Sequence, residues 1–182
     1  MKITTKKIAE AGLLFAIILI MQTIKNISAF ISGPIINAVL VIAALEIGIW
    51  WGIAFSIITP LTSIFIAPMS PMTMITQATY GVNLPVIMIG NIIFVLFAYY
   101  GRKKGEKEFI FGLILGAVVK WLFMWGCADL IIKPLFEQNL GKLVAAVNKV
   151  FSTLQLYSAL LGAVIIYPVS RAISAAKGKK DE

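Results

Sequence analysis

Histidine is absent from this sequence of 182 residues, and cysteine occurs once, at Cys127. A disulfide framework needs paired cysteines, while Cys/His zinc sites and Ser-His triads need histidine, so all of these are excluded. Charged residues are also scarce, at 13% of the chain against roughly a quarter in soluble domains, whereas 60% of the residues are hydrophobic. The composition therefore indicates a chain that folds in a lipid bilayer.

A phosphate-binding loop of the form G-x-x-x-x-G-K-[ST] is also missing, so we do not expect this chain itself to hydrolyse ATP. No nucleophile stands beside a base and no metal-ligand cluster is visible, so we expect neither an enzyme nor a bound cofactor or metal. The net charge of +8 does not indicate a nucleic-acid partner, because the cations gather at the ends of apolar runs. Binding or transport of a small molecule remains.

Hydropathy and helix breakers predict an all-α polytopic protein of the cell membrane, with residues 1–182 forming a single six-helix transmembrane domain. The start of the chain imitates a secretory signal peptide, but its apolar run is too long and no cleavage site follows, so we expect a retained first span. The predicted spans are 8–27, 35–50, 51–67, 84–100, 109–132 and 150–173.

Breaks between these spans are predicted from proline, glycine and charge. Ser32-Gly33-Pro34 should separate the first two spans, and Pro60 should kink the third because it removes a backbone donor. Residues 68–83 form a polar, proline-bearing connection, residues 101–108 a charged loop, and residues 133–149 an amphipathic stretch that is partly helical.

The distribution of Lys and Arg orients the chain, because positive loops stay in the cytoplasm. With six spans, both termini and the 101–108 loop share one side. That side holds Lys2, Lys6, Lys7, Arg102, Lys103, Lys104, Lys107, Arg171, Lys177, Lys179 and Lys180, whereas the other holds only Lys25, Lys133, Lys142 and Lys149. We therefore expect both termini to be cytoplasmic.

Lys120 lies within the fifth predicted span, where a charge is costly and is by default a functional hypothesis. Trp121, Trp125 and Asp129 follow at a spacing of four residues and give one helix face an aromatic and acidic character. This outer half of the helix is a candidate lining of a polar cavity. Alternatively, Lys120 pairs with a neighbour or extends to the interface, and the two tryptophans serve packing.

Amide and phenol side chains lie at the same outward ends of the spans. An apolar pocket with a few convergent polar groups suits a small hydrogen-bonding ligand. The alternative is that these amides only join helices by hydrogen bonds. The further candidate ligand-binding residues are Gln22, Asn26, Asn37, Asn83, Asn91, Gln155 and Tyr157.

Small residues mark one face of the first span, where Ala9, Gly12 and Ala16 share a stripe. Small side chains let another helix approach closely, either from a partner subunit or from within the same chain.

With this length, six spans, cytoplasmic termini and the Gly12-xxx-Ala16 motif near the start of the first span, the chain resembles the substrate-binding S components of energy-coupling factor (ECF) transporters. Those proteins carry Ala-xxx-Ala at this place. The resemblance implies a high-affinity vitamin-binding subunit that docks through the first helix on a transmembrane coupling subunit driven by two ABC-type ATPases. It also implies a ligand in the outer half, enclosed by the later helices and covered by the 28–34 and 68–83 loops.

The substrate stays open at this level. Lys120 and Lys25 favour a vitamin with a carboxylate, whereas Trp121 and Trp125 favour a heteroaromatic one. Two other functions remain as alternatives: a small secondary transporter coupled to ions through Asp129 or Glu46, and a structural membrane subunit without a ligand.

Overall fold

The computed structural model describes the backbone of residues 4–178 and the side chains of residues 4–176. Every regular element in this range is helical, which confirms the all-α prediction. The elements are α1 (Thr5–Lys25), α2 (Ala29–Glu46), α3 (Ile49–Ile66), α4 (Pro71–Ala78), α5 (Asn83–Lys104), α6 (Glu106–Cys127), η1 (Ala128–Ile132), α7 (Lys133–Leu140), η2 (Gly141–Leu143), α8 (Val144–Asn148), η3 (Lys149–Thr153) and α9 (Leu154–Gly178).

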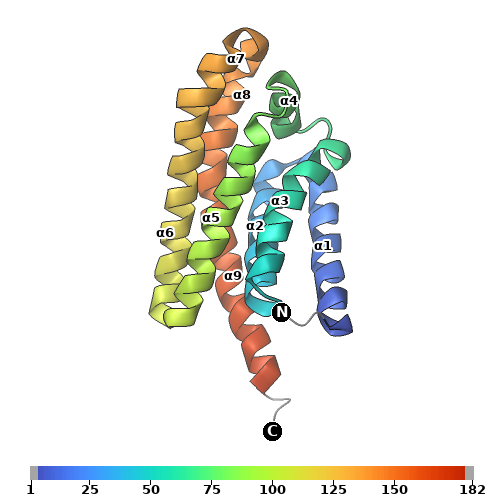
Figure 1. Ribbon diagram of the computed structural model, residues 1–182, viewed down its shortest axis with the longest axis vertical. Coiled ribbons are helices and arrows are strands. Elements are labelled where there is room, and N and C mark those ends of the chain that lie inside the picture. Colours follow the sequence, from blue (N-terminus) through green and yellow to red (C-terminus); the bar gives the residue numbers. More distant parts are fainter. Residues whose placement is uncertain (1–3, 179–182) are drawn as a thin grey trace.

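Five stretches of the described chain are long and apolar enough to cross a membrane. Four of them are α1, α2, α3 and α5, and the fifth runs over 71 residues from Glu106 to Ala176. This fifth stretch folds back on itself, because α6 ascends and α9 descends in the view of Figure 1. Residues 4–178 therefore contain six helices that are long and apolar enough to cross a membrane, in agreement with the prediction.

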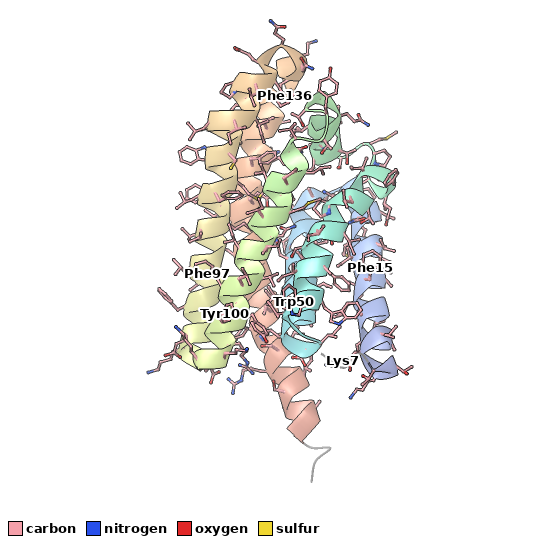
Figure 2. The ribbon with its side chains drawn as sticks, in the orientation of Figure 1. Lys7, Phe15, Trp50, Phe97, Tyr100 and Phe136 are labelled. Carbon is pink, nitrogen blue, oxygen red and sulfur yellow. The ribbon has the colours of Figure 1, made fainter. Side chains whose placement is uncertain are left out.

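The two ends of the described chain lie on the same side of the bundle. The start of α1, the end of α9 and the turn between α5 and α6 all lie at the lower end in Figure 1, while α4, α7 and α8 lie at the upper end. Figure 2 shows Lys7 and Tyr100 toward the lower end and Phe136 at the opposite end. The positive-inside rule predicts that this cation-rich lower end faces the cytoplasm. Lys2, Lys179 and Lys180, which the sequence assigns to this side, fall outside the described residues.

Three predicted connections are more helical than expected. The 101–108 segment is not a loop, because α5 ends at Lys104, α6 begins at Glu106, and only Gly105 separates them, with a φ of 153°. Cations at the end of α5 and acids at the start of α6 suit the two helix dipoles. Helix α2 begins at Ala29 and contains Pro34, so Ser32-Gly33-Pro34 lies within the helix and does not form the predicted break before it. The 68–83 connection contains α4.

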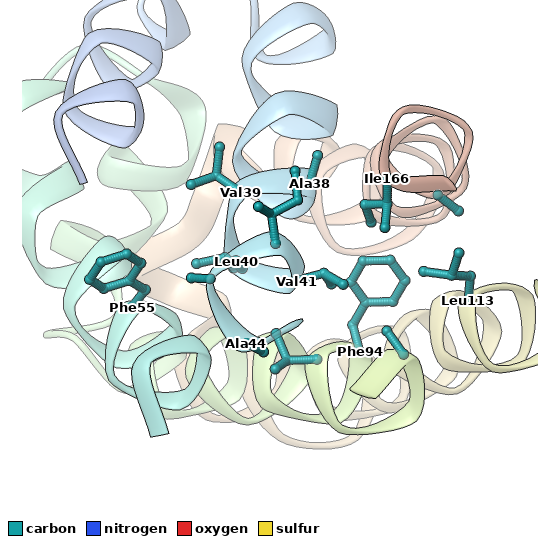
Figure 3. Packing of buried hydrophobic residues seen from close by; sticks show 14 of the residues in the cluster. Ala38, Val39, Leu40, Val41, Ala44, Phe55, Phe94, Leu113 and Ile166 are labelled. Carbon is teal, nitrogen blue, oxygen red and sulfur yellow. The ribbon is translucent and has the colours of Figure 1, made fainter. Parts of the chain in front are cut away.

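Helix α2 occupies the centre of the lower half of the bundle in Figure 1, with a continuous buried run from Asn37 to Ala44. In Figure 3 its side chains pack between Phe55 of α3, Phe94 of α5 and Ile166 of α9. A helix that is apolar on every side is expected where all faces are covered by other helices. This core fills the lower half of the bundle, and the polar residues of the upper half lie around a cavity.

Glycines bring α5 and α6 into close contact. A Cβ atom on Gly112 would lie 2.5 Å from the carbonyl oxygen of Phe97, and one on Gly101 would lie 2.6 Å from that of Glu108. Small residues permit such close backbone approach between membrane helices.

We expect Gly112→Ala to lower the stability of the protein in detergent by about 1–3 kcal/mol, because the added methyl group meets the backbone of α5. Gly126→Ala in the same helix is the matched control, since a Cβ there would have nothing within 4 Å. Thermal unfolding should show a loss for Gly112→Ala and none for Gly126→Ala. Equal behaviour of the two variants would contradict the close packing of α5 on α6.

Candidate ligand-binding cavity

A cavity of about 100 Å³ lies between the helices, on the side of the bundle away from the chain ends. It is lined from α1, α2, α3, α4, α5, α6, η3 and the start of α9, rather than from the later helices alone. Its walls are formed by Gln22, Lys25, Ala29, Ser32, Gly33, Ile36, Asn37, Thr59, Pro60, Ser63, Ile64, Pro71, Met72, Thr73, Thr76, Leu84, Ile87, Asn91, Lys120, Val150, Leu154, Gln155 and Ser158. Among the described residues that line it, none is acidic and none is aromatic.

Lys120 is the deepest charge of the cavity, with 1% of its surface exposed. Its Nζ donates to Oδ1 of Asn37 at 2.7 Å and to Oδ1 of Asn91 at 2.8 Å. No carboxylate of the described chain lies within 4.0 Å of this Nζ. The two amide oxygens therefore solvate the ammonium group without neutralising its charge.

Asn37, one of the two hydrogen-bond partners of Lys120, is itself held by contacts with α9. Asn37 Nδ2 donates to Ser158 Oγ at 3.2 Å, and Ser158 Oγ donates to the carbonyl oxygen of Gln155 at 3.2 Å. A Cβ on Gly33 would lie 2.9 Å from the Cβ of Ser158, so α2 and α9 are in close contact here. The Asn37 side chain is thus held in one orientation, with its oxygen toward Lys120.

The upper wall of the cavity is built from α1 and α3. Gln22 Nε2 donates to the carbonyl oxygen of Thr59 at 2.8 Å and to Thr62 Oγ1 at 3.0 Å, and Lys25 Nζ donates to Ser63 Oγ at 2.9 Å. Gln22 Oε1 and Thr59 Oγ1 are buried and have no hydrogen-bond partner. Buried polar atoms are normally paired, so these two unpaired oxygen atoms are unusual features of the cavity wall.

Helix α4 closes the cavity from the outside. Its first turn is capped by Ser70, whose Oγ accepts from the backbone N–H of Thr73 at 3.3 Å, and Pro71 occupies the first turn. Pro71, Met72, Thr73 and Thr76 face the cavity. The predicted 68–83 cover is thus a helix, whereas most of the predicted 28–34 cover forms the first turns of α2.

The structure brings five of the predicted ligand-binding residues into this one cavity: Gln22, Asn37, Asn91, Lys120 and Gln155. Three others lie elsewhere. Asn83 ties α4 to α5, because its Nδ2 donates to Thr76 Oγ1 at 3.0 Å and its Oδ1 accepts from Thr79 at 3.1 Å. Asn26 donates to the carbonyl oxygen of Ile66 at 3.4 Å, and Tyr157 packs edge-on against Phe30.

The Trp121, Trp125 and Asp129 face lies apart from the cavity that contains Lys120. The two indole rings stack at 6.1 Å, and Trp125 and Asp129 border a separate, open hollow beside α7 and α8, where Asp129 pairs with Lys133. Consecutive helical residues point about 100° apart, so Lys120 can point into the bundle while Trp121 does not. The shared helix face predicted from the spacing is present, but it does not line the same cavity as Lys120.

Sequence reasoning missed the hydroxyl groups of this cavity. Ser32, Thr59, Ser63, Thr73 and Thr76 are buried and line its walls. The signal that could have found them is the grouping of hydroxyls near Pro60 in an otherwise apolar span, since polar groups within a membrane tend to face the protein interior.

The small-residue stripe of α1 faces away from the bundle. Ala9, Gly12 and Ala16 are all exposed, and a Cβ added to Gly12 would have nothing within 4 Å. Packing within the described chain therefore does not account for this stripe.

In a comparison with known protein families, the model described as "ECF transporter, substrate-specific component" matches residues 6–174. No curated protein and no solved structure matches the chain. The matched region contains every residue that lines the cavity and the small-residue stripe of α1.

Proposed function

This chain belongs to the family of ECF transporter substrate-specific components, and from that membership we propose that it binds a vitamin or a related small organic nutrient with high affinity in the cavity below α4. The observation that carries the proposal is the cavity itself, which combines apolar walls with a few fixed polar groups and two buried oxygen atoms without hydrogen-bond partners. The proposed location is the cell membrane.

The energy for uptake would come from partner subunits. We propose that the exposed Ala9, Gly12 and Ala16 stripe docks on a transmembrane coupling subunit, which is driven by two ABC-type ATPases. Support comes from the exposure of the stripe and from the open space at Gly12, where an added Cβ would have nothing within 4 Å, which leave room for the close approach of a partner helix.

Ion-coupled transport by this chain alone has less support from the geometry. Asp129 is paired with Lys133 at the rim of the open hollow, apart from the cavity, and no acidic residue lines the cavity within the described chain. A proton relay through Asp129 would therefore have no direct contact with the bound ligand.

We expect the protein purified from cells to carry its ligand, and Met72→Trp to remove it. Met72 of α4 lines the cavity, so the larger indole would occupy the ligand volume, whereas Met74 on the same helix does not line it. Mass spectrometry of small molecules released on denaturation should find one compound in the wild type and in Met74→Trp, and a strong reduction in Met72→Trp. Equal ligand content in the two variants would contradict binding in this cavity.

A further inference from the structure

We propose, resting on the function proposed above, that the ligand is a small aliphatic carboxylate whose other end carries a hydroxyl or N–H group. The carboxylate binds at Lys120 and Asn91, and the donor group reaches Gln22 and Thr59. Charge, hydrogen-bond inventory and wall composition each support one part of this assignment.

The charge of the cavity is positive. Lys25 and Lys120 both line it, and the described lining holds no Asp or Glu that would compensate them. Lys120 is almost fully buried; its two hydrogen-bond partners are neutral amides, and its Nζ also lies 5.8 Å from the centroid of the Phe94 ring. Because a buried charge without a counter-ion is destabilising, a bound anion supplies what the protein itself does not.

The free N–H donors of Lys120 and Asn91 fit a carboxylate, because a carboxylate accepts hydrogen bonds but does not donate them. An ammonium group has three N–H donors, and only two of those of Lys120 are used by Asn37 and Asn91. Since lysine cannot accept, Asn91 must turn its oxygen to Lys120, which leaves its Nδ2 as a further donor. Within the described chain this Nδ2 has no hydrogen-bond partner, and Asn91 lines the cavity.

The unpaired amide oxygen of Gln22 at the upper wall can only accept, so it fits a ligand group that donates. The carbonyl oxygen of Thr59 can only accept, so Gln22 must turn its Nε2 to it, and Oε1 is then the free atom. Gln22 Oε1 and Thr59 Oγ1 are both buried and unpaired. A hydroxyl or N–H group on the ligand would satisfy the amide oxygen.

The walls between these two ends favour an aliphatic body. They include Ile36, Pro60, Ile64, Leu84 and Ile87, and no aromatic ring belongs to the described lining. The stacked Trp121 and Trp125 rings lie outside it. Stacking on a heteroaromatic ligand is therefore not available in this cavity, although the sequence left that choice open.

The test is retention of small molecules by the purified, ligand-stripped protein from an equimolar mixture. The mixture contains pantothenate with panthenol, biotin with biotinamide, nicotinate with nicotinamide, and riboflavin, thiamine and pyridoxine. After gel filtration, mass spectrometry should find an aliphatic carboxylate retained at least about tenfold over its uncharged counterpart, which lacks the ionic contact. Retention of an uncharged, cationic or aromatic compound instead would overturn the proposed substrate class but leave ligand binding intact. Retention of no compound would contradict the proposed function itself.

Asn91→Asp tests whether the ligand is bound through its negative charge, because the substitution changes the charge of the cavity but hardly its shape. The variant keeps the acceptor 2.8 Å from Lys120 Nζ but adds a built-in carboxylate, which competes with that of the ligand. The affinity for the retained compound should fall at least about tenfold. Asn148→Asp makes the same change at an Asn that accepts from Lys133, outside the cavity, and should leave the affinity unchanged. Unchanged affinity in Asn91→Asp, with normal thermal unfolding, would overturn the assignment of an anion to this end.

Discussion

Lys120→Met is expected to lower the affinity for the ligand about 100-fold, the largest effect of any single change in the cavity, because truncating a buried charge-assisted contact costs about 2–5 kcal/mol. Methionine keeps the length and the apolar stem of the side chain, so the cavity retains its shape. The Nζ that donates to Asn37 and Asn91 is lost, and with it the ionic contact proposed for the carboxylate. Equilibrium binding of the compound that the wild type retains measures the effect.

Lys133→Met is the matched control for this prediction. Lys133 also donates to an asparagine, Asn148, at 2.7 Å, but borders the open hollow rather than the cavity. Its removal should leave the affinity within about twofold of the wild type, as is usual for a contact remote from a binding site. Equal losses in both variants, or none in Lys120→Met with its fold retained, would remove Lys120 from the binding site.

Gly12→Leu is expected to abolish uptake in cells while ligand binding survives. The added side chain starts from an exposed face of α1, where a Cβ has nothing within 4 Å, so we expect the fold and the cavity to be undisturbed. It would, however, prevent close approach of a partner helix at the small-residue stripe. Ala16→Leu should have the same effect, one turn along the same face.

Gly126→Leu provides the control for a bulky residue on a membrane helix, since a Cβ at Gly126 also has nothing within 4 Å. Uptake should remain normal in this variant. Uptake assays combined with co-purification of the coupling subunit distinguish the outcomes. Normal uptake in both Gly12→Leu and Ala16→Leu, or loss of ligand binding in both, would contradict the division of roles between α1 and the cavity.

The helical architecture was predictable from sequence because it follows from apolar length alone. Six runs long enough to span a bilayer, with cations at one side, leave few arrangements of the chain. The boundaries were less accurate. Glycine and proline at Ser32-Gly33-Pro34 indicated a break, yet α2 includes them, since neighbouring helices stabilise a membrane helix around a proline.

The candidate site was predictable only in part. Lys120 and the amides Asn37 and Asn91 were found because polar side chains within a span are costly and converge on one another. The sequence alone could not predict whether Trp121 and Trp125 face the cavity. That depends on how α6 packs against α5 and α9, which only the structure shows. The unpaired oxygen of Gln22 likewise depends on its contact with Thr59, which lies 37 residues away in the chain.

The most direct measurement of the central claim compares two sets of proteoliposomes with the same radiolabelled ligand. Vesicles that hold this protein alone should bind about one equivalent of ligand without accumulating it, because one cavity provides one site and no energy source. Vesicles that also hold the coupling subunit and two ATPases should accumulate ligand when ATP is supplied. Accumulation against a gradient by the protein alone would contradict the account.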